Sequence, residues 1–382
     1  MPQQNLLIFG ASTRAAAFSA IRAGLRPKCA DLFADADLRA RCPVQRLAAN
    51  DYPRRFLDLI QREVAAPWMY TGGLENWSKL VAKMEQQRSL WGNGMPVLMR
   101  ARSPWFVADI LRRADLPYLE VQRPGEERPC ARRWLVKLLE GTGGRGIDFW
   151  DGKQVGRRRV YLQRYVPGEP HAAVYLGDGR CARFLGLARQ LVGETWLHAP
   201  SFHYCGSVGP VAIAPLPQAA LEQLGNVLTE GCGLRGLFGV DGIVHAGTFW
   251  PVEINPRYPA SVEVLEYATG LAALDLHRSV FESDTRPASK PRPSREVVGK
   301  AISFARDGLT FPADGPWSAN LRSPIPVEEM PRFADVPQPG ETLQAGRPVL
   351  TYFARGRSAE DCVGELRQTA AELQGWLYRR GR

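Results

Sequence analysis

The chain has 382 residues, of which 45% are hydrophobic and 23% are charged, a balance that is ordinary for a soluble globular enzyme. No run of about eighteen apolar residues could span a bilayer, and the first residues enter an apolar strand without a basic leader, so we expect a cytoplasmic protein. The net charge of +10 would suit a nucleic-acid surface, but the arginines are scattered without interleaved aromatic residues, which disfavours nucleic-acid binding. The seven cysteines form no Cys-x-x-Cys pair, which disfavours a zinc ribbon.

The N-terminal region predicts a β-α-β opening. Residues 6–9 are typical of a buried strand, 14–23 of a helix and 28–32 of a second strand. The turn at residues 10–12 has only the first glycine of a dinucleotide fingerprint, so a scaffold or substrate-contact role is favoured over NAD binding. Residues 67–74 predict another strand and a glycine turn before a helix near Asn76, and this turn is a candidate wall of a site.

The next region predicts a lysine strand and a glycine loop. After a linker near residue 90, a helix is expected over 104–114 and a strand over 116–121. The apolar strand at 134–139 carries Lys137, which either faces solvent or meets an anion in a cleft, because an unpaired buried ammonium is costly. The backbone N–H groups of the loop at 142–146 can approach phosphate oxygens, although the loop lacks the Gly-Lys-Ser/Thr of a Walker motif.

Strands expected over 160–163 and 172–176 flank a hinge that contains proline and glycine. Its backbone could cover a flat base, although the plainer interpretation is a connecting loop. Helices are expected over 216–231 and 261–278, a linker over 285–294, and a closing helix over 358–379 after a β-rich segment.

Polar and apolar residues alternate along the predicted strand that ends at Pro256. Glu253 and Asn255 therefore leave the same face of that strand. A predicted hairpin turn at residues 245–248 brings Asp241, on the preceding strand, opposite them. Either half alone is more often a solvated edge or a turn, but together these oxygen groups suit Mg²⁺ and its phosphate partners. Arg257 follows as a planar fork for a carboxylate or phosphate.

The order of these motifs resembles that of the ATP-grasp enzymes, across roughly residues 90–280. Within them the chain is most similar to the carboxylate-amine ligase branch that includes the pyrrolysine-pathway ligase and the tyramine-glutamate ligase of methanofuran synthesis. The resemblance implies a mixed α/β and α+β fold with a Rossmann-like pre-ATP-grasp domain at 1–95 and an ATP-grasp domain at 96–284. Two α+β subdomains, 96–170 and 171–284, would clasp ATP, and a linker with a small β-rich domain and terminal helix would occupy 285–382.

The resemblance also implies an ADP-forming reaction that joins a small-molecule carboxylate to an amine through an acyl phosphate, with ATP and Mg²⁺ or Mn²⁺ as cofactors. Asp241, Glu253 and Asn255 would hold the metal. Lys137 and Arg257 would be the catalytic residues, with Lys137 on the phosphates and Arg257 on the acceptor carboxylate. The other implied nucleotide contacts are Thr142, Gly143, Gly144 and Gly146 over the γ-phosphate, Gln163, Arg164, Tyr165 and Val166 around adenine, and Glu169 at the ribose.

The chain departs from the family pattern at two positions. Gln163 stands where many relatives have glutamate, and Arg102 is the candidate for a phosphate contact that a strand lysine usually makes, against the alternative of a solvated arginine. Gln190 is expected to face either the cleft or a neighbouring strand. An ATP-grasp carboxylase, a phosphotransferase and a nucleotide-binding sensor or pseudo-enzyme stay open as alternatives, and a homodimer is the default expectation.

Overall fold

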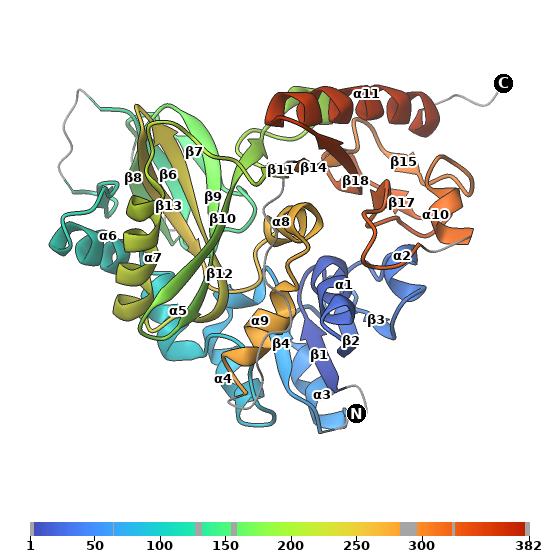
Figure 1. The fold of residues 1–382 in the computed structure, drawn as a ribbon, viewed down its shortest axis with the longest axis horizontal. Helices are drawn as coiled ribbons and strands as arrows, with labels where there is room; N and C mark the ends of the chain where they lie inside the picture. Colours follow the sequence, from blue (N-terminus) through green and yellow to red (C-terminus); the bar gives the residue numbers. More distant parts are fainter. Residues whose placement is uncertain are drawn as a thin grey trace.

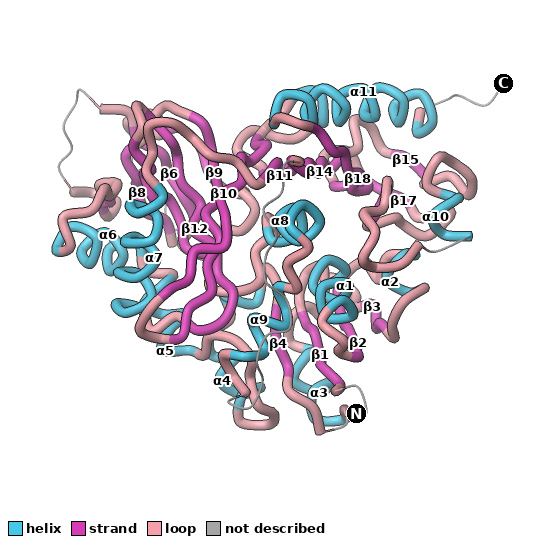
Figure 2. The backbone as a smooth tube through the Cα atoms, in the orientation of Figure 1, coloured by secondary structure: helices cyan, strands magenta, loops and turns pink. Residues whose placement is uncertain are grey.

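The structure is a computed structural model that describes residues 4–63, 65–126, 132–153, 159–282, 296–322 and 325–378. A parallel sheet, a small antiparallel sheet and a long antiparallel sheet organise these residues (Figures 1 and 2). In the described part of the chain, no helix is long and apolar enough to cross a membrane. The predicted linker at 285–294 lies outside the described residues.

The N-terminal sheet is parallel, with strand order β3-β2-β1-β4. Leu6 and Ile8 pack in one core cluster and Leu7 and Phe9 in another, so β1 is buried on both faces. This explains its unbroken apolar run and confirms the β-α-β prediction. The elements are β1 (Asn5–Phe9), α1 (Arg14–Arg22), β2 (Arg26–Asp31), α2 (Ala36–Arg39), β3 (Val44–Arg46), α3 (Arg55–Arg62), β4 (Trp68–Tyr70), the 3-10 turn η1 (Leu74–Asn76) and α4 (Ser78–Glu85).

The small sheet is antiparallel, with order β5-β8-β6-β7. The predicted helix at 104–114 is confirmed as α6, whose N-terminus is capped by the Ser103 hydroxyl accepting from the Phe106 N–H. The predicted strand over 116–121 is wrong for most of its length. The Leu116 N–H still donates to Leu111 O at the helix end, and pairing with β8 begins only at Val121. The elements are α5 (Met95–Ala101), α6 (Pro104–Arg113), β5 (Val121–Gln122), β6 (Trp134–Leu138), β7 (Ile147–Phe149) and β8 (Val160–Arg164).

The long sheet has the order β13-β12-β9-β10-β11-β14-β18-β16, so the C-terminal strands extend the same sheet as the β12–β13 hairpin. The domain boundaries stay a prediction. The helical stretch expected over 261–278 is present as two helices, because Gly270, at φ 67°, ends α8 before α9 begins. The strands are β9 (Glu169–Asp178), β10 (Ala182–Val192), β11 (Tyr204–Gly209), β12 (Arg235–His245), β13 (Thr248–Asn255), β14 (Val297–Phe304), β16 (Phe333–Ala334) and β18 (Pro348–Gly356), with β15 (Leu309–Thr310) and β17 (Thr342–Leu343) forming a separate pair.

Helices pack against two separate parts of the long sheet. In Figure 1, α7 lies against the β9–β10 side and α11 lies across β14 and β18, while α8 stands between the sheet and α1. A capping box between Ser358 and Asp361 starts α11. The remaining elements are η2 (Thr195–Leu197), α7 (Gln218–Cys232), α8 (Val262–Thr269), α9 (Ala273–Ser279), α10 (Ser318–Arg322) and α11 (Ala359–Leu377).

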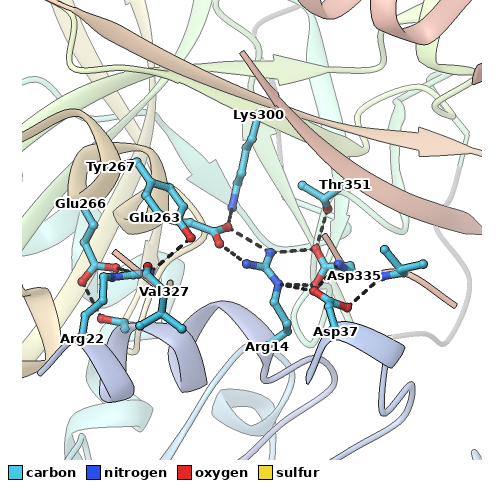
Figure 3. A network of polar contacts seen from close by, with 12 residues as sticks. Arg14, Arg22, Asp37, Glu263, Glu266, Tyr267, Lys300, Val327, Asp335 and Thr351 are labelled. Carbon is cyan, nitrogen blue, oxygen red and sulfur yellow. Dashed lines mark hydrogen bonds and ion pairs between the residues drawn. The ribbon is translucent and has the colours of Figure 1, made fainter. Parts of the chain in front are cut away.

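A buried ion cluster joins the N-terminal, middle and C-terminal parts of the chain (Figure 3). Arg14 on α1 pairs with Glu263 on α8 and donates to both carboxylate oxygens of Asp335, each at 2.9 Å. Lys300 on β14 donates to the second oxygen of Glu263 at 3.0 Å. Burial by itself raises the pKa of Glu263, but Arg14 and Lys300 outweigh it and hold that pKa below its usual value. The three parts therefore share one charge-compensated core.

A buried histidine makes a second link. The His277 Nδ1 on α9 accepts from the Leu237 N–H on β12 at 2.9 Å, and its Nε2 donates to Trp91 O at 3.0 Å. Gly236 is required beside it, because its φ is 74° and a Cβ there would lie 2.5 Å from the His277 ring. Burial lowers the pKa of His277 to about 4, so the ring is neutral at pH 7.

We expect Glu263→Gln to lower the free energy of unfolding by about 3–5 kcal/mol, because it removes the carboxylate that Arg14 and Lys300 share and leaves the buried Lys300 ammonium facing a neutral amide. Urea unfolding followed by tryptophan fluorescence measures the change. Glu230→Gln, on the exposed side of α7, is the matched control and should stay within about 0.5 kcal/mol of the wild type. A loss below about 1 kcal/mol for Glu263→Gln would contradict the assignment.

His277 also predicts a pH dependence. An unfolded histidine binds a proton below about pH 6.5, whereas the folded His277 does so only near pH 4. The unfolded chain therefore gains protons first, and the free energy of unfolding should fall by up to about 3 kcal/mol as the pH drops through this window. Unfolding curves at pH 7.5 and 5 test this: His277→Gln should flatten the dependence, while His245→Gln, at the exposed end of β12, should not.

Candidate active site

The predicted hairpin of β12 and β13 is present. Ala246 and Gly247 form its turn with φ values of 48° and 73°, as a two-residue hairpin of this type requires. Asp241 pairs with Glu253 across the strands. The Asn255 Nδ2 donates to Asp241 Oδ2 at 2.8 Å. The three oxygen-bearing side chains expected at a metal site thus lie together.

The two carboxylates of this group have opposite pKa shifts, because different charges surround them. Desolvation, with the neighbouring charge of Glu253, raises the pKa of Asp241 to about 6. For Glu253, burial also acts upward, but the cations Arg102 and Lys137 outweigh it and its pKa lies below the usual value. The Gln190 Nε2 donates to Asp241 Oδ1 at 3.0 Å. Of the two orientations expected for Gln190, the structure shows the one that faces the cleft.

Lys137 is buried, with 4% of its surface exposed, so it does not lie on a solvated face. Its Nζ donates to Gln163 Oε1 at 3.0 Å. The Gln163 Nε2 in turn donates to Val252 O on β13 at 3.1 Å. Lys137 therefore reaches the cleft between the small sheet and the long sheet.

A cavity of about 240 Å³ lies between these two sheets. It brings together most of the expected site residues. It also has walls that the sequence did not indicate, namely Phe202, Tyr204 and Ser261. The expected residues that line it are Lys137, Gly143, Gly144, Gln163, Arg164, Tyr165, Val166, Asp241, Glu253, Asn255 and Arg257.

Four expected nucleotide contacts lie elsewhere. Thr142 and Arg102 line an adjoining cavity of about 60 Å³, which shares Lys137 and Glu253 with the larger one. Gly146 and Glu169 border neither cavity. The backbone explains why residue 146 is a glycine, since its φ is 72° and a Cβ there would lie 2.3 Å from Leu138. Glu169 starts β9 with its side chain exposed.

Arg102 is held between three segments and is not a solvated arginine. It pairs with Glu253 on β13, and its Nη2 donates to Gly141 O at 3.0 Å and to Asn76 Oδ1 at 3.1 Å. The guanidinium thus connects β13 with the start of the glycine loop. Its expected contact with a phosphate stays a prediction.

Arg257 is oriented by a buried acid that the sequence did not reveal. Its Nε donates to Glu75 Oε1 at 3.2 Å and its Nη2 to Asn255 Oδ1 at 2.8 Å. Glu75 is only 2% exposed. Gly72 lies beneath the guanidinium, where a Cβ would be 3.4 Å from Nη2, so the predicted glycine turn does reach the site. In the sequence, the Gly-Gly turn before Glu75 was the only indication that this segment could line a site.

The glycine loop touches the opposite wall of the cleft. Gly144 has a φ of 84°, and a Cβ there would lie 1.8 Å from Phe202 O. The Tyr204 N–H donates to Gly143 O at 3.3 Å. Phe149 at the end of β7 adds a ring contact with Phe202, at 5.6 Å between centroids. The loop therefore closes this side of the cavity by direct contact.

The donor set fits a magnesium ion. Among the described residues, no group of three or more His, Cys, Asp and Glu side chains is arranged to hold a metal ion. Asp241, Glu253 and Asn255 instead supply two carboxylates and one amide oxygen, and Mg²⁺ commonly takes one or two carboxylates and completes its shell with water and phosphate. These three residues suit a metal that arrives with a phosphate ligand.

We expect Gly144→Ala to open the glycine loop, because the new methyl group would overlap Phe202 O. Gly143→Ala is the matched control, since Gly143 also has a positive φ, 61°, but no atom lies within 4 Å of its Cβ position. Amide hydrogen exchange at Tyr204 measures the effect. Exchange should become faster in Gly144→Ala than in Gly143→Ala, and equal rates in the two variants would refute the contact.

Comparisons with known proteins agree with this geometry. Residues 101–261 match the family model of the ATP-grasp domain. The chain is 21% identical over 247 residues to an uncharacterised protein of Methanocaldococcus jannaschii, covering 63% of this chain and 55% of that protein. It is 27% identical over 149 residues to the formate-dependent phosphoribosylglycinamide formyltransferase of Azotobacter vinelandii, covering 34% of each. The aligned parts thus span about half and about a third of these relatives.

Two solved structures align with nearly the whole chain. The L-amino acid ligase from Bacillus licheniformis has a TM-score of 0.70 at 16% identity, with 97% of this chain and 98% of that chain covered. The ADP complex of an N5-carboxyaminoimidazole ribonucleotide synthetase has a TM-score of 0.69 at 14% identity, with 98% of both covered. At such identities the likeness shows the fold. The chain therefore has the ATP-grasp fold, and its residues 101–261 are an ATP-grasp domain.

Proposed function

We propose that this protein is an ATP-dependent ligase that joins a small-molecule carboxylate to an amine and releases ADP and phosphate. One observation carries the proposal. A single cavity is lined by a fixed ammonium, Lys137, by the oxygen ligands Asp241, Glu253 and Asn255, and by the guanidinium of Arg257. These groups match the phosphates, the metal and the carboxylate that such a reaction brings together. The proposal keeps the division into residues 1–95, 96–284 and 285–382.

The phosphate end of the cavity would be set by Lys137 and the glycine loop. The ammonium binds phosphate oxygens, and the loop, in contact with Phe202, covers them and keeps water away from an acyl phosphate. Asp241, Glu253 and Asn255 would hold Mg²⁺ or Mn²⁺, which when bound supplies charge neutralisation on the phosphates. Positioning and electrostatics of this kind account for most of the catalysis of phosphoryl transfer.

The acceptor end would be set by Arg257. Its contacts with Glu75, Asn255 and Tyr258 O use three of its five N–H groups, so two face no partner among the described residues. A substrate carboxylate can accept from these two. One carboxylate oxygen then attacks the γ-phosphorus as the bond to the departing ADP breaks. The amine nitrogen attacks the acyl carbon, phosphate leaves, and the amine proton passes to solvent.

The solved structures that share this fold include both ligases and carboxylases. The L-amino acid ligase aligns with this chain over 97% of its length, which is consistent with amide formation. A biotin carboxylase domain of a 2-oxoglutarate carboxylase has a TM-score of 0.70, so the carboxylase is kept as an outcome of the test. We expect the partners to be a small-molecule carboxylate and an amine, and the assembly to be a homodimer.

We expect Glu253→Gln to lower ADP formation by about 10²-fold or more with ATP, Mg²⁺ and a mixed pool of amino acids and amines, because it removes a charge opposite the transferring phosphoryl group. Coupled ADP detection, followed by mass spectrometry of active wells, measures rate and product. Glu230→Gln should keep wild-type activity. Carboxylated or phosphorylated product would replace the ligase assignment, and nucleotide binding without substrate-stimulated ADP release would indicate a sensor.

A further inference from the structure

Gln163 occupies the hinge position that the family resemblance assigns to adenine, but its side chain is engaged elsewhere. We propose that Gln163 is a positioning residue that fixes the Lys137 ammonium against the nucleotide phosphates and does not itself recognise the base. The inference rests on the proposed nucleotide site. It adds to that site a role for Gln163 that contact between the hinge and adenine does not require.

Both ends of the Gln163 amide have a partner, and the partners dictate its orientation. The Lys137 ammonium can only donate, so it must face Oε1, at 3.0 Å. The Val252 carbonyl can only accept, so it must face the NH₂ group, at 3.1 Å. The side chain is 4% exposed, so losing either bond would leave a buried polar group without its partner. The amide is therefore held in one arrangement.

The two bonds connect three strands. Gln163 lies on β8, Lys137 on the neighbouring β6, and Val252 on β13 of the other sheet. Val252 directly precedes Glu253, the expected metal ligand. One amide therefore sets the distance between the phosphate-binding cation and the strand that carries the metal ligands. A residue that only contacted adenine would not need this bridge across the cleft.

The neutral amide also suits this role better than the glutamate of many relatives. A carboxylate would still attract Lys137, but it would place a second acceptor against the Val252 carbonyl in place of a donor. Among the described residues, Gln163 is the only hydrogen-bond acceptor of the Lys137 ammonium. Because this acceptor is neutral, the lysine charge stays available for a phosphate.

The experiment compares MgADP with adenosine, which has the base but no phosphate. Isothermal titration gives the affinity for MgADP, and displacement of a fluorescent ADP analogue gives the affinity for adenosine. Gln163→Leu should weaken MgADP by about 10- to 100-fold, on the order of one hydrogen bond to a charged group, and should leave adenosine within about 2-fold. Gln122→Leu, on the neighbouring strand β5 and outside both cavities, is the matched control.

A double-mutant cycle with Lys137→Met tests whether Gln163 acts through the lysine. The double variant should bind MgADP no more weakly than Lys137→Met alone. Gln163→Glu, which keeps the acceptor for Lys137, should bind MgADP between the wild type and Gln163→Leu, and it serves if the leucine variant does not fold. Additive losses, or an equal loss for adenosine and MgADP, would overturn the inference. A wild-type protein that binds no nucleotide would instead overturn the proposed function and this inference with it.

Discussion

The architecture depends on the neutralisation of one buried carboxylate. Glu263 has no exposed surface, and a carboxylate in such a place is tolerated only when cations compensate it. The cations come from the two ends of the chain, Arg14 from the N-terminal helix and Lys300 from a C-terminal strand. Ser261, two residues earlier, lines the cavity between the small sheet and the long sheet. The ion pairs that hold Glu263 in the core therefore also hold Ser261, two residues away, in the wall of the cleft.

The charged side chains of the cleft are compensated by partners in the same way. Each charged group there has a partner before a nucleotide is considered: Glu253 has Arg102, Arg257 has Glu75, and Lys137 has the neutral oxygen of Gln163. These contacts fix side chains that would otherwise lose rotational freedom on binding a substrate. Under the proposed function, charges held in this way would be preorganised for the phosphate and carboxylate groups of the substrates.

The sequence predicted those features that follow from local spacing. The alternation around Glu253 and the turn at 245–248 were sufficient to place Asp241 opposite Glu253, because strand period and turn chemistry are local. The parts it did not predict depend on long-range contacts. Glu75 lies 182 residues before Arg257, and Arg102 lies 151 residues before Glu253. Nothing in the neighbourhood of Glu75 distinguishes a buried acid from a helix-start acid, and only tertiary packing makes that choice. The helical stretch expected over 261–278 is present, but the sequence pattern did not predict the break at Gly270 that divides it into α8 and α9.

The continuity of the long sheet has a consequence for how the protein can be divided. The segment that matches the ATP-grasp family ends at residue 261, yet β11 inside it pairs on its far edge with β14, which begins at Val297. An excised segment 101–261 would expose that edge as an unpaired row of backbone donors and acceptors, the usual template for aggregation. It would also lose Glu263, the carboxylate that both ends of the chain compensate. The segment 101–261 is thus a unit of sequence but not a separable unit of folding. An exchange of this segment between relatives would have to include the C-terminal strands.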